Sequence, residues 1–309
     1  MQTSRSIAMS PRLIAPLLCL AAAPALAATP IDETRPLAAD GQVSIDNVKG
    51  RIQVEAWDRP EVSITGSLGE GVEGLELEGD EDALSIRVRY PRRGGGWFGW
   101  GGGDGGEPSE LRVRVPAGAS VNVDAVSATV EVGGVGGRRL EVDSVSGNVM
   151  VRDARPGEAR LASVSGDLEA ALDTRDLRAE TVSGDIGLRG RVEGRVQIES
   201  VSGDVDVEAG MLERLVFSSV SGDARLALAL ARGGSVQAET LSGRLDLVLP
   251  AATSARLQVE SFSGRISSPV GEVKTEKYGP GSRLETRLGA GEGEIRAESF
   301  SGNVRIVIR

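Results

Sequence analysis

Carboxylate side chains recur at a fixed place in this sequence, and they are its residues best suited to chemistry. One set precedes a repeated Ser-containing phrase and comprises Asp124, Asp143, Glu180, Glu199, Glu239, Glu260 and Glu298. A second set follows the phrase and comprises Asp167, Asp185, Asp204 and Asp223, with Arg244 and Arg265 at the equivalent later positions. Hard cations take oxygen ligands and paired carboxylates hydrolyse glycosides, but both functions need carboxylates that converge on one site. Because the spacing marks no such convergence, we expect a solvated acidic face and no metal site.

The composition excludes most other catalytic chemistry. The 309 residues contain no His, and the single Cys, Cys19, lies in an N-terminal segment that we expect to be removed. His is the commonest general acid–base residue near neutral pH, and zinc sites and thiol nucleophiles also depend on His or Cys. We therefore expect a protein that is not an enzyme and has no cofactor. A carboxylate-dependent polysaccharide enzyme is the weaker alternative.

The net charge bears on the kinds of partner. The formal charge is −10, and it becomes −12 without residues 1–27, because that segment holds two Arg and no acidic residue. Nucleic acids and anionic lipids attract cationic proteins. The acidic balance therefore disfavours nucleic acid and passive adsorption to a membrane surface.

Residues 1–27 have the features of a secretory signal peptide. They combine a basic start, a Leu- and Ala-rich run over residues 13–26, and a small-x-small cleavage site at Ala25-Leu26-Ala27. This run is too short to span a bilayer, and no other run is long and apolar enough. We expect export to the periplasm or cell envelope of a bacterium, with surface display as the alternative, and no transmembrane segment in the mature chain.

A ninefold repeat must position all these residues. The serine of a Ser/Thr-Val-Ser-Gly-Asp-like phrase recurs at Ser127, Ser146, Ser165, Ser183, Ser202, Ser221, Ser242, Ser263 and Ser301. The steps are 19, 19, 18, 19, 19, 21, 21 and 38 residues, and the last is twice 19, so one copy is expected to be overwritten near Ser282. A fixed period near 20 residues predicts a stacked repeat architecture.

Within each repeat, apolar residues alternate with polar ones on both sides of the phrase. Such alternation predicts half-buried strands, so each repeat reads as strand, Gly corner, strand and turn. An antiparallel meander and a parallel solenoid both fit this order. Like residues recur at equivalent positions, as in Val130, Val149 and Leu168, which favours parallel stacking. We predict an all-β, single-stack parallel β-solenoid (β-helix) of about 19-residue coils with an irregular N-terminal β cap.

The corner glycine is present in eight of the nine copies. We expect it to adopt a left-handed or otherwise strained backbone angle, while the neighbouring hydroxyls bond local backbone groups or each other. These structural glycines are Gly147, Gly166, Gly184, Gly203, Gly222, Gly243, Gly264 and Gly302.

An apolar residue stands between the two hydroxyl residues of each copy. Its members are Val145, Val164, Val182, Val201, Val220, Leu241, Phe262 and Phe300. If the alternation ran unbroken, this column would face outward and offer a docking surface. We favour a kink at the Ser that turns the column into the core, because exposed apolar stripes are uncommon in soluble proteins.

The rest of the chain divides around the repeats. We expect a short linker over residues 28–40, irregular N-terminal coils and cap over 41–120, and regular solenoid repeats over 121–309. A Gly/Trp-rich loop at 91–108 interrupts the second part. We favour a disordered insertion between two strands, and contact with a partner through Trp97, Phe98 and Trp100 is the alternative.

These motifs suggest a family. The serial phrase, the unit at residues 47–52 followed by 57–62, and the closing residues 298–303 resemble the bacterial "putative adhesin" family of unknown function. The resemblance implies an exported β-solenoid of the cell envelope and supplies no catalytic residues. We expect a non-enzymatic binding or scaffold module whose solenoid faces contact an envelope protein or a glycan. A regulatory partner in envelope-stress signalling is the alternative.

Overall fold

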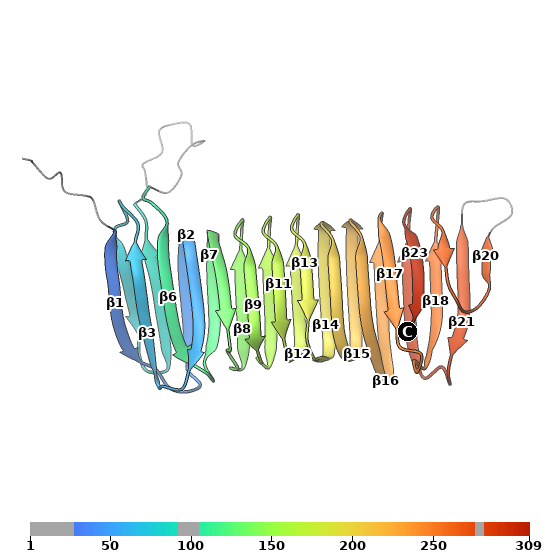
Figure 1. The fold of residues 1–309 in the computed structure, drawn as a ribbon, viewed down its shortest axis with the longest axis horizontal. Helices are drawn as coiled ribbons and strands as arrows, with labels where there is room; N and C mark the ends of the chain where they lie inside the picture. Colours follow the sequence, from blue (N-terminus) through green and yellow to red (C-terminus); the bar gives the residue numbers. More distant parts are fainter. Residues whose placement is uncertain (1–27, 92–104, 276–280) are drawn as a thin grey trace, which may run out of the picture.

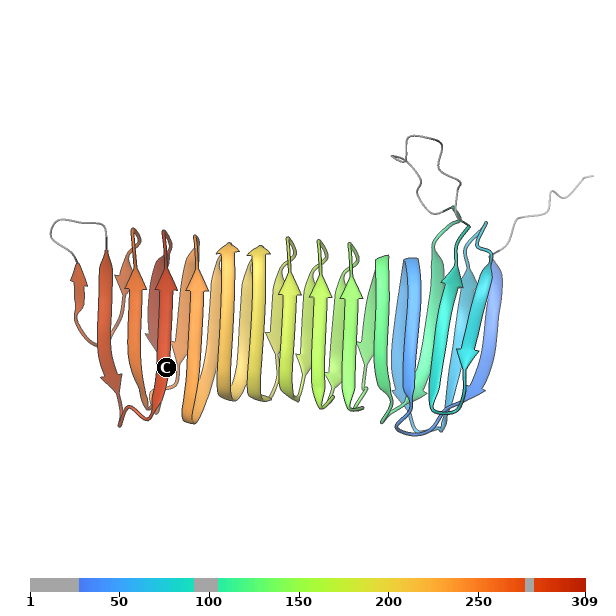
Figure 2. The ribbon, with the colours of Figure 1, turned by 180° about the vertical axis from the view of Figure 1, so that it is seen from behind.

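The chain forms one long stack of β-coils. The computed structural model describes residues 28–91, 105–275 and 281–309, and every regular element in these ranges is a β-strand. Figure 1 shows the coils side by side along the long axis, and they keep the same order when seen from behind (Figure 2). Within these ranges there is no helix that could cross a membrane.

Each coil contributes one strand to each of two faces. The leading face, which precedes the Ser-Gly corner, contains β8 (Arg139–Ser144), β10 (Glu158–Ser163), β12 (Thr174–Thr181) and β14 (Val192–Ser202). The trailing face, which follows the corner, contains β9 (Val149–Ala154), β11 (Leu168–Leu172) and β13 (Ile186–Arg189). Two long strands, β15 (Val205–Ser221) and β16 (Ala224–Thr240), run on from the trailing face to the leading face of the next coil.

Successive coils pair in parallel, as the residue columns predicted. In the leading face Leu161 of β10 lies beside Val142 of β8, 19 residues earlier. In the trailing face Leu168 lies between Val149 and Ile186. Equivalent residues therefore stack directly on one another at the usual strand spacing of about 4.8 Å.

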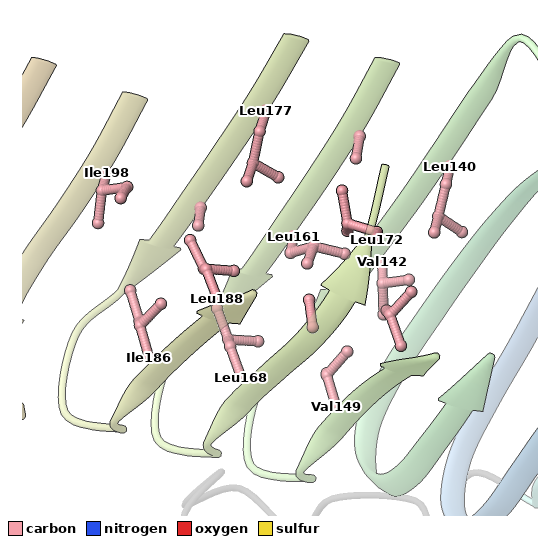
Figure 3. Packing of buried hydrophobic residues seen from close by; sticks show 14 of the residues in the cluster. Leu140, Val142, Val149, Leu161, Leu168, Leu172, Leu177, Ile186, Leu188 and Ile198 are labelled. Atoms are coloured by element: carbon pink, nitrogen blue, oxygen red, sulfur yellow. The ribbon is translucent and has the colours of Figure 1, made fainter. Parts of the chain in front are cut away.

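The core is the space between the two faces. Figure 3 shows Leu161 and Leu177 from the leading face near Leu168, Ile186 and Leu188 from the trailing face. Of these, four are at most 2 % exposed and Leu177 is 4 % exposed. Burying one such side chain stabilises the fold by about 1.5–3 kcal/mol. A single coil can bury only one side of these residues, so the stack is stable only as a whole.

The corner glycines are required for a reason other than the expected one. Only Gly203, Gly222 and Gly243 have φ in the left-handed region, at 127°, 120° and 106°. The other five corner glycines lie outside that region, so the expectation of a left-handed angle is wrong for them. At all eight corners, however, a Cβ would overlap the carbonyl oxygen of the equivalent residue in a neighbouring coil. Close approach of neighbouring coils therefore explains the glycine.

The C-terminal coils do not follow chain order. The strands here are β17 (Arg244–Leu249), β18 (Ala255–Ser261), β19 (Ile266–Ser267), β20 (Val273–Thr275), β21 (Ser282–Leu288), β22 (Gly293–Ser299) and β23 (Asn303–Ile308). The last coil, β22 and β23, pairs with β16 and β17 on one side and with β18 and β19 on the other. The last coil is thus inserted before the penultimate one, and Figure 1 shows β23 between β17 and β18.

The copy expected to be overwritten near Ser282 is replaced by an antiparallel strand. β21 pairs antiparallel with β18, with Ser282 opposite Ser261, and β20 pairs antiparallel with β21. Antiparallel pairing breaks the repeat at this edge of the leading face, so a further equivalent coil has no matching strand direction to extend.

The N-terminal end also contains antiparallel strands. Its elements are β1 (Thr29–Pro36), β2 (Gln42–Trp57), β3 (Glu61–Leu68), β4 (Gly74–Gly79), β5 (Ala83–Arg89), β6 (Ser109–Pro116) and β7 (Ser120–Gly133). β2 pairs in parallel with β7 over both faces, so a coil that stacks like the later ones already exists at residues 42–57. β1 and β4 pair antiparallel with β3 and β5. The prediction of a linker at residues 28–40 is therefore wrong, because this segment contains β1, which pairs with β3 along its whole length.

We predict that Gly166→Ala destabilises the fold strongly, because the new methyl group would overlap the Gly147 carbonyl oxygen. Overpacking of this kind costs about 1–3 kcal/mol in the free energy of unfolding. Gly187→Ala is the matched control, because its Cβ would lie 3.8 Å from the nearest atom and its φ is ordinary. Urea denaturation of both variants checks this, and equal midpoints would contradict the close-approach explanation.

Candidate functional site

The apolar residues inside the repeated phrase form an exposed column. Nine side chains are 45–54 % exposed: Val126, Val145, Val164, Val182, Val201, Val220, Leu241, Phe262 and Phe300. The expectation that a kink turns this column into the core is wrong. The alternation continues as far as the apolar residue of the phrase, so Ile198 and Ser200 point inward while Val201 points outward and is 47 % exposed.

In five copies of the phrase, a hydrogen bond made by the buried hydroxyl residue before the apolar one explains why the apolar side chain points outward. Ser144 is buried, and its Oγ accepts a hydrogen bond of 3.1 Å from the backbone N–H of Gly147. The same bond joins Gly166 to Ser163 and Gly184 to Thr181, at 2.9 and 3.0 Å. An inward valine could not satisfy the buried corner N–H, and leaving it unpaired would cost about 1–3 kcal/mol. The inward place is therefore taken by the hydroxyl.

The second serine of the phrase fixes each apolar residue to the next coil. Ser165 Oγ donates to the Val145 carbonyl oxygen at 3.1 Å, and the equivalent bond recurs along the stack. At the inserted coil, Ser301 Oγ donates to Leu241 and Ser263 Oγ donates to Phe300, at 3.0 and 3.2 Å. The insertion thus keeps the column continuous.

Two aromatic rings end the column. Because the last coil lies next to the penultimate one, Phe300 and Phe262 are neighbours although 38 residues separate them. Their ring centroids are 4.9 Å apart and their planes are inclined by 11°, so the rings stack. The apolar surface is therefore broadest at this end.

A groove of about 1540 Å³ runs along this column. Its lining contains the exposed apolar side chains, the first set of carboxylates and the hydroxyl residues that stand between them in the sequence. Carboxylate and apolar residue are two positions apart in the strand, so both point to the outer side of the leading face. The groove is thus a strip that is apolar along one edge and acidic along the other.

Strand pairing defines the acidic edge residue by residue. In spatial order it consists of Arg87, Asp46, Asp124, Asp143, Ala162, Glu180, Glu199, Ser218, Glu239, Glu298, Glu260 and Arg283. Sequence reasoning missed Asp46, Arg87 and Arg283. Aligning residues 43–50 with 121–128 would have identified Asp46, but only the strand pairing reveals the two arginines.

Arginines form ion pairs with the carboxylates at both ends of the acidic edge, whereas some carboxylates between them have no ion pair in the described ranges. Arg87 pairs with Asp46 and Arg283 pairs with Glu260, both at 3.4 Å. Within the part of the chain that the structure describes, Asp124, Asp143 and Glu239 have no ion pair. The same residues contain no cluster of His, Cys, Asp or Glu that could hold a metal ion.

Stacked carboxylates affect each other's titration. Burial raises the pKa of Asp124, and the nearby carboxylates of Asp46 and Asp143 raise it further. Burial also raises the pKa of Asp143, while Arg160 opposes this effect. Deprotonation of these two carboxyls is therefore disfavoured, and a nearby cation would favour it.

The second set of carboxylates has a structural role on the trailing face. The side chain of each Asp accepts a hydrogen bond from the backbone N–H of its equivalent in the next coil. Asp185 bonds Asp167 at 3.0 Å, Asp204 bonds Asp185 at 2.7 Å, and Asp223 bonds Asp204 at 2.8 Å. The ladder stops at Arg244, whose N–H donates to Asp223 at 2.9 Å and whose side chain cannot accept. The Asp-to-Arg change thus interrupts the ladder, and the same kind of bond recurs where Asn303 Oδ1 accepts from the Arg265 N–H at 3.0 Å.

The remaining residues singled out from the sequence are three aromatic residues and the eight corner glycines. Trp97, Phe98 and Trp100 lie outside the residues that the structure describes. The eight corner glycines lie where the two faces meet, and they bring the coils into contact without lining the groove.

Comparison with known proteins gives one family match. The family model described as Toastrack DUF4097 matches residues 41–307 of the chain. No curated protein matches.

Several solved structures are similar over most of the chain. A "Putative lipid binding protein" from Parabacteroides distasonis is 15 % identical, with 90 % of this chain and 97 % of that chain covered and a TM-score of 0.47. A "putative adhesin" from the same organism is 12 % identical, with 91 % and 98 % covered and a TM-score of 0.34. A "putative cell adhesion protein" from Clostridium sporogenes is 11 % identical, with 91 % and 100 % covered and a TM-score of 0.21.

We predict that Asp143→Asn stabilises the fold at about pH 7 and not at about pH 3. A carboxyl with a raised folded-state pKa holds its proton longer in the native state, so its contribution to stability falls as pH rises through that window. The gain at neutral pH should be roughly a few tenths of a kcal/mol, because Asn removes a charge that partial burial disfavours and that solvent still screens. Urea denaturation at both pH values measures it, with exposed Glu169→Gln on the trailing face as the control. A gain of equal size at both pH values would contradict the electrostatic cause.

Proposed function

The chain belongs to the Toastrack DUF4097 family, and from that premise we propose that it is a non-enzymatic binding module whose ligand occupies the groove. The observation that carries the proposal is the unbroken column of nine exposed apolar side chains along one edge of the groove.

The exposure of this column supports a binding role, because exposed apolar area is unfavourable in water and is confined almost entirely to this column in the described ranges. Large apolar side chains exposed in one contiguous line mark interaction sites in soluble proteins. Outside the column, the only other large apolar side chain with such exposure in the described ranges is Met211, at 58 %. Apolar exposure is therefore concentrated in the groove.

The arrangement of the carboxylates supports binding over catalysis. In the acidic edge they follow one another from strand to strand in a row, with Ala162 and Ser218 as interruptions. Glycoside hydrolysis instead needs two carboxylates that face each other across the scissile bond. A row of equivalent groups suits repeated weak contacts with an elongated ligand.

We further propose that the protein works in the cell envelope after export. The support is the signal-peptide pattern of residues 1–27. An envelope protein or a glycan is then the kind of partner that the groove would meet.

Nile red, a neutral apolar dye, tests the groove directly. We expect its fluorescence to rise with the wild-type protein and its affinity to fall about tenfold in the triple variant Val164→Thr, Val182→Thr, Val201→Thr, because burial of apolar area drives binding. Threonine keeps the β-branched shape that suits a strand. Met211→Thr is the control, since it removes an exposed apolar side chain outside the groove.

Two outcomes would contradict the proposed function. Dye binding that survives the triple variant, or that Met211→Thr weakens equally, would show that the column is not a binding surface. Hydrolysis of a polysaccharide that Glu180→Gln abolishes would support the carboxylate-dependent enzyme instead.

Export predicts a defined mature protein. When the full chain is produced in a Gram-negative bacterium, we expect it in the osmotic-shock fraction with Ala28 as its first residue, and a chain without residues 1–27 should stay in the cytoplasm. Intact-mass measurement of both fractions checks this. A full-length chain that keeps residues 1–27 would contradict the signal-peptide interpretation.

A further inference from the structure

We infer that the groove binds an amphipathic peptide helix that has a cationic flank and lies along the axis of the stack. This inference rests on the proposed function and specifies the chemistry of the ligand. Charge complementarity and the spacing of the two edges carry it.

The apolar edge has the length and repeat of a helix. Nine coils at about 4.8 Å place the first and last apolar side chains about 38 Å apart. A helix rises about 5.4 Å per turn and presents about one apolar residue per turn on a narrow face, so its repeat is close to that of the coils. An extended strand along the same axis would place same-face side chains about 6.7 Å apart, a poorer match. A helix of 18 residues, about 27 Å long, would cover five to six coils.

The acidic edge lies at the right distance from the apolar one. Asp143 and Val145 are two residues apart on the same outer side of their strand, which separates the two edges by about 6–7 Å. A helix with its side chains is about 10–12 Å wide. A helix seated on the apolar edge therefore brings Lys or Arg on one flank to the carboxylates.

The carboxylates of the acidic edge favour a positively charged flank on the helix. The outer arginines Arg87 and Arg283 already pair with Asp46 and Glu260 at the two ends of the acidic edge. Between them lie carboxylates without an ion pair in the described ranges, including Asp124 and Asp143. A cationic flank would neutralise these groups, whereas an anionic lipid headgroup would face like charges at close range.

A neighbouring arginine, Arg178, affects where along the groove a cationic helix flank would be attracted most strongly. Arg178 lies in the next row of the leading face; it bonds Glu180 and lies 3.8 Å from Glu199. Glu180 and Glu199 lie beside Arg178, whereas Asp124 and Asp143 have no ion pair in the described ranges. The coils around Val126 and Val145 should therefore contribute most of the electrostatic attraction.

The test uses three synthetic 18-residue fluorescent peptides and fluorescence anisotropy. The first places Leu and Lys at helical spacing on two faces, the second replaces every Lys with Glu, and the third scrambles the Leu/Lys order. We expect the first peptide to bind at least tenfold more tightly than the other two. Its binding should also weaken with added salt, because screening reduces attraction between exposed charges.

Two charge-matched triple variants locate the contact. Asp124→Asn, Asp143→Asn, Glu199→Gln neutralises three carboxylates of the acidic edge and should weaken binding of the Leu/Lys peptide about tenfold. Glu169→Gln, Glu193→Gln, Glu213→Gln makes the same change in net charge at residues that do not line the groove, and it should change the affinity less than twofold. Thermal denaturation of both variants verifies that each is folded.

The outcomes separate this inference from the proposed function. Nile red binding with no preference for the cationic helix would overturn the inference and leave the proposed function intact. If both triple variants lost the same affinity for the Leu/Lys peptide, the peptide would be attracted by the net charge of the protein, and the inference would be overturned. Binding to phosphatidylcholine vesicles that depends on Val164, Val182 and Val201, without binding of the peptide, would identify a lipid ligand instead. If the wild-type protein did not bind Nile red, both the proposed function and this inference would be overturned.

Discussion

The parallel backbone pairing between neighbouring coils is the interaction on which the rest of the structure depends. It places each residue of one coil directly beside its equivalent in the next, as with Val149, Leu168 and Ile186. A side chain at one position is therefore repeated as a column, whether it is apolar, hydroxylic or acidic. The corner glycines belong to this constraint, because a side chain there would push the coils apart.

The groove is a consequence of the same stacking. A single coil offers one apolar and one acidic side chain two residues apart, which is too little surface to hold a ligand. Nine coils in register turn that pair into two parallel edges and a groove of about 1540 Å³. Affinity in such a surface comes from many equivalent contacts, so it suits an elongated partner more than a small molecule. The insertion of the last coil preserves this continuity and brings Phe262 and Phe300 together.

Much of the fold could be predicted because stacking leaves a signature in the order of residues. Like residues at equivalent positions predicted the strands and the parallel pairing, and the columns at Val130 and Val132 are buried as that pairing requires. The predicted inward direction of Val201 is wrong, because the local alternation outweighs the general scarcity of exposed apolar stripes on soluble proteins. The buried hydroxyl of the neighbouring residue, which bonds the corner in several coils, explains why the alternation continues.

By itself, the sequence determined the repeat unit, the two strands of each coil and the residue types that form each column, because these follow from local alternation and period. Only the tertiary structure decided that the last coil inserts before the penultimate one, and that antiparallel strands such as β21 end the stack. It also decided that the apolar and acidic columns enclose one groove. These features depend on which strands pair across long chain separations, and equivalent coils offer nearly the same pairing edge, so period and alternation cannot distinguish between their neighbours.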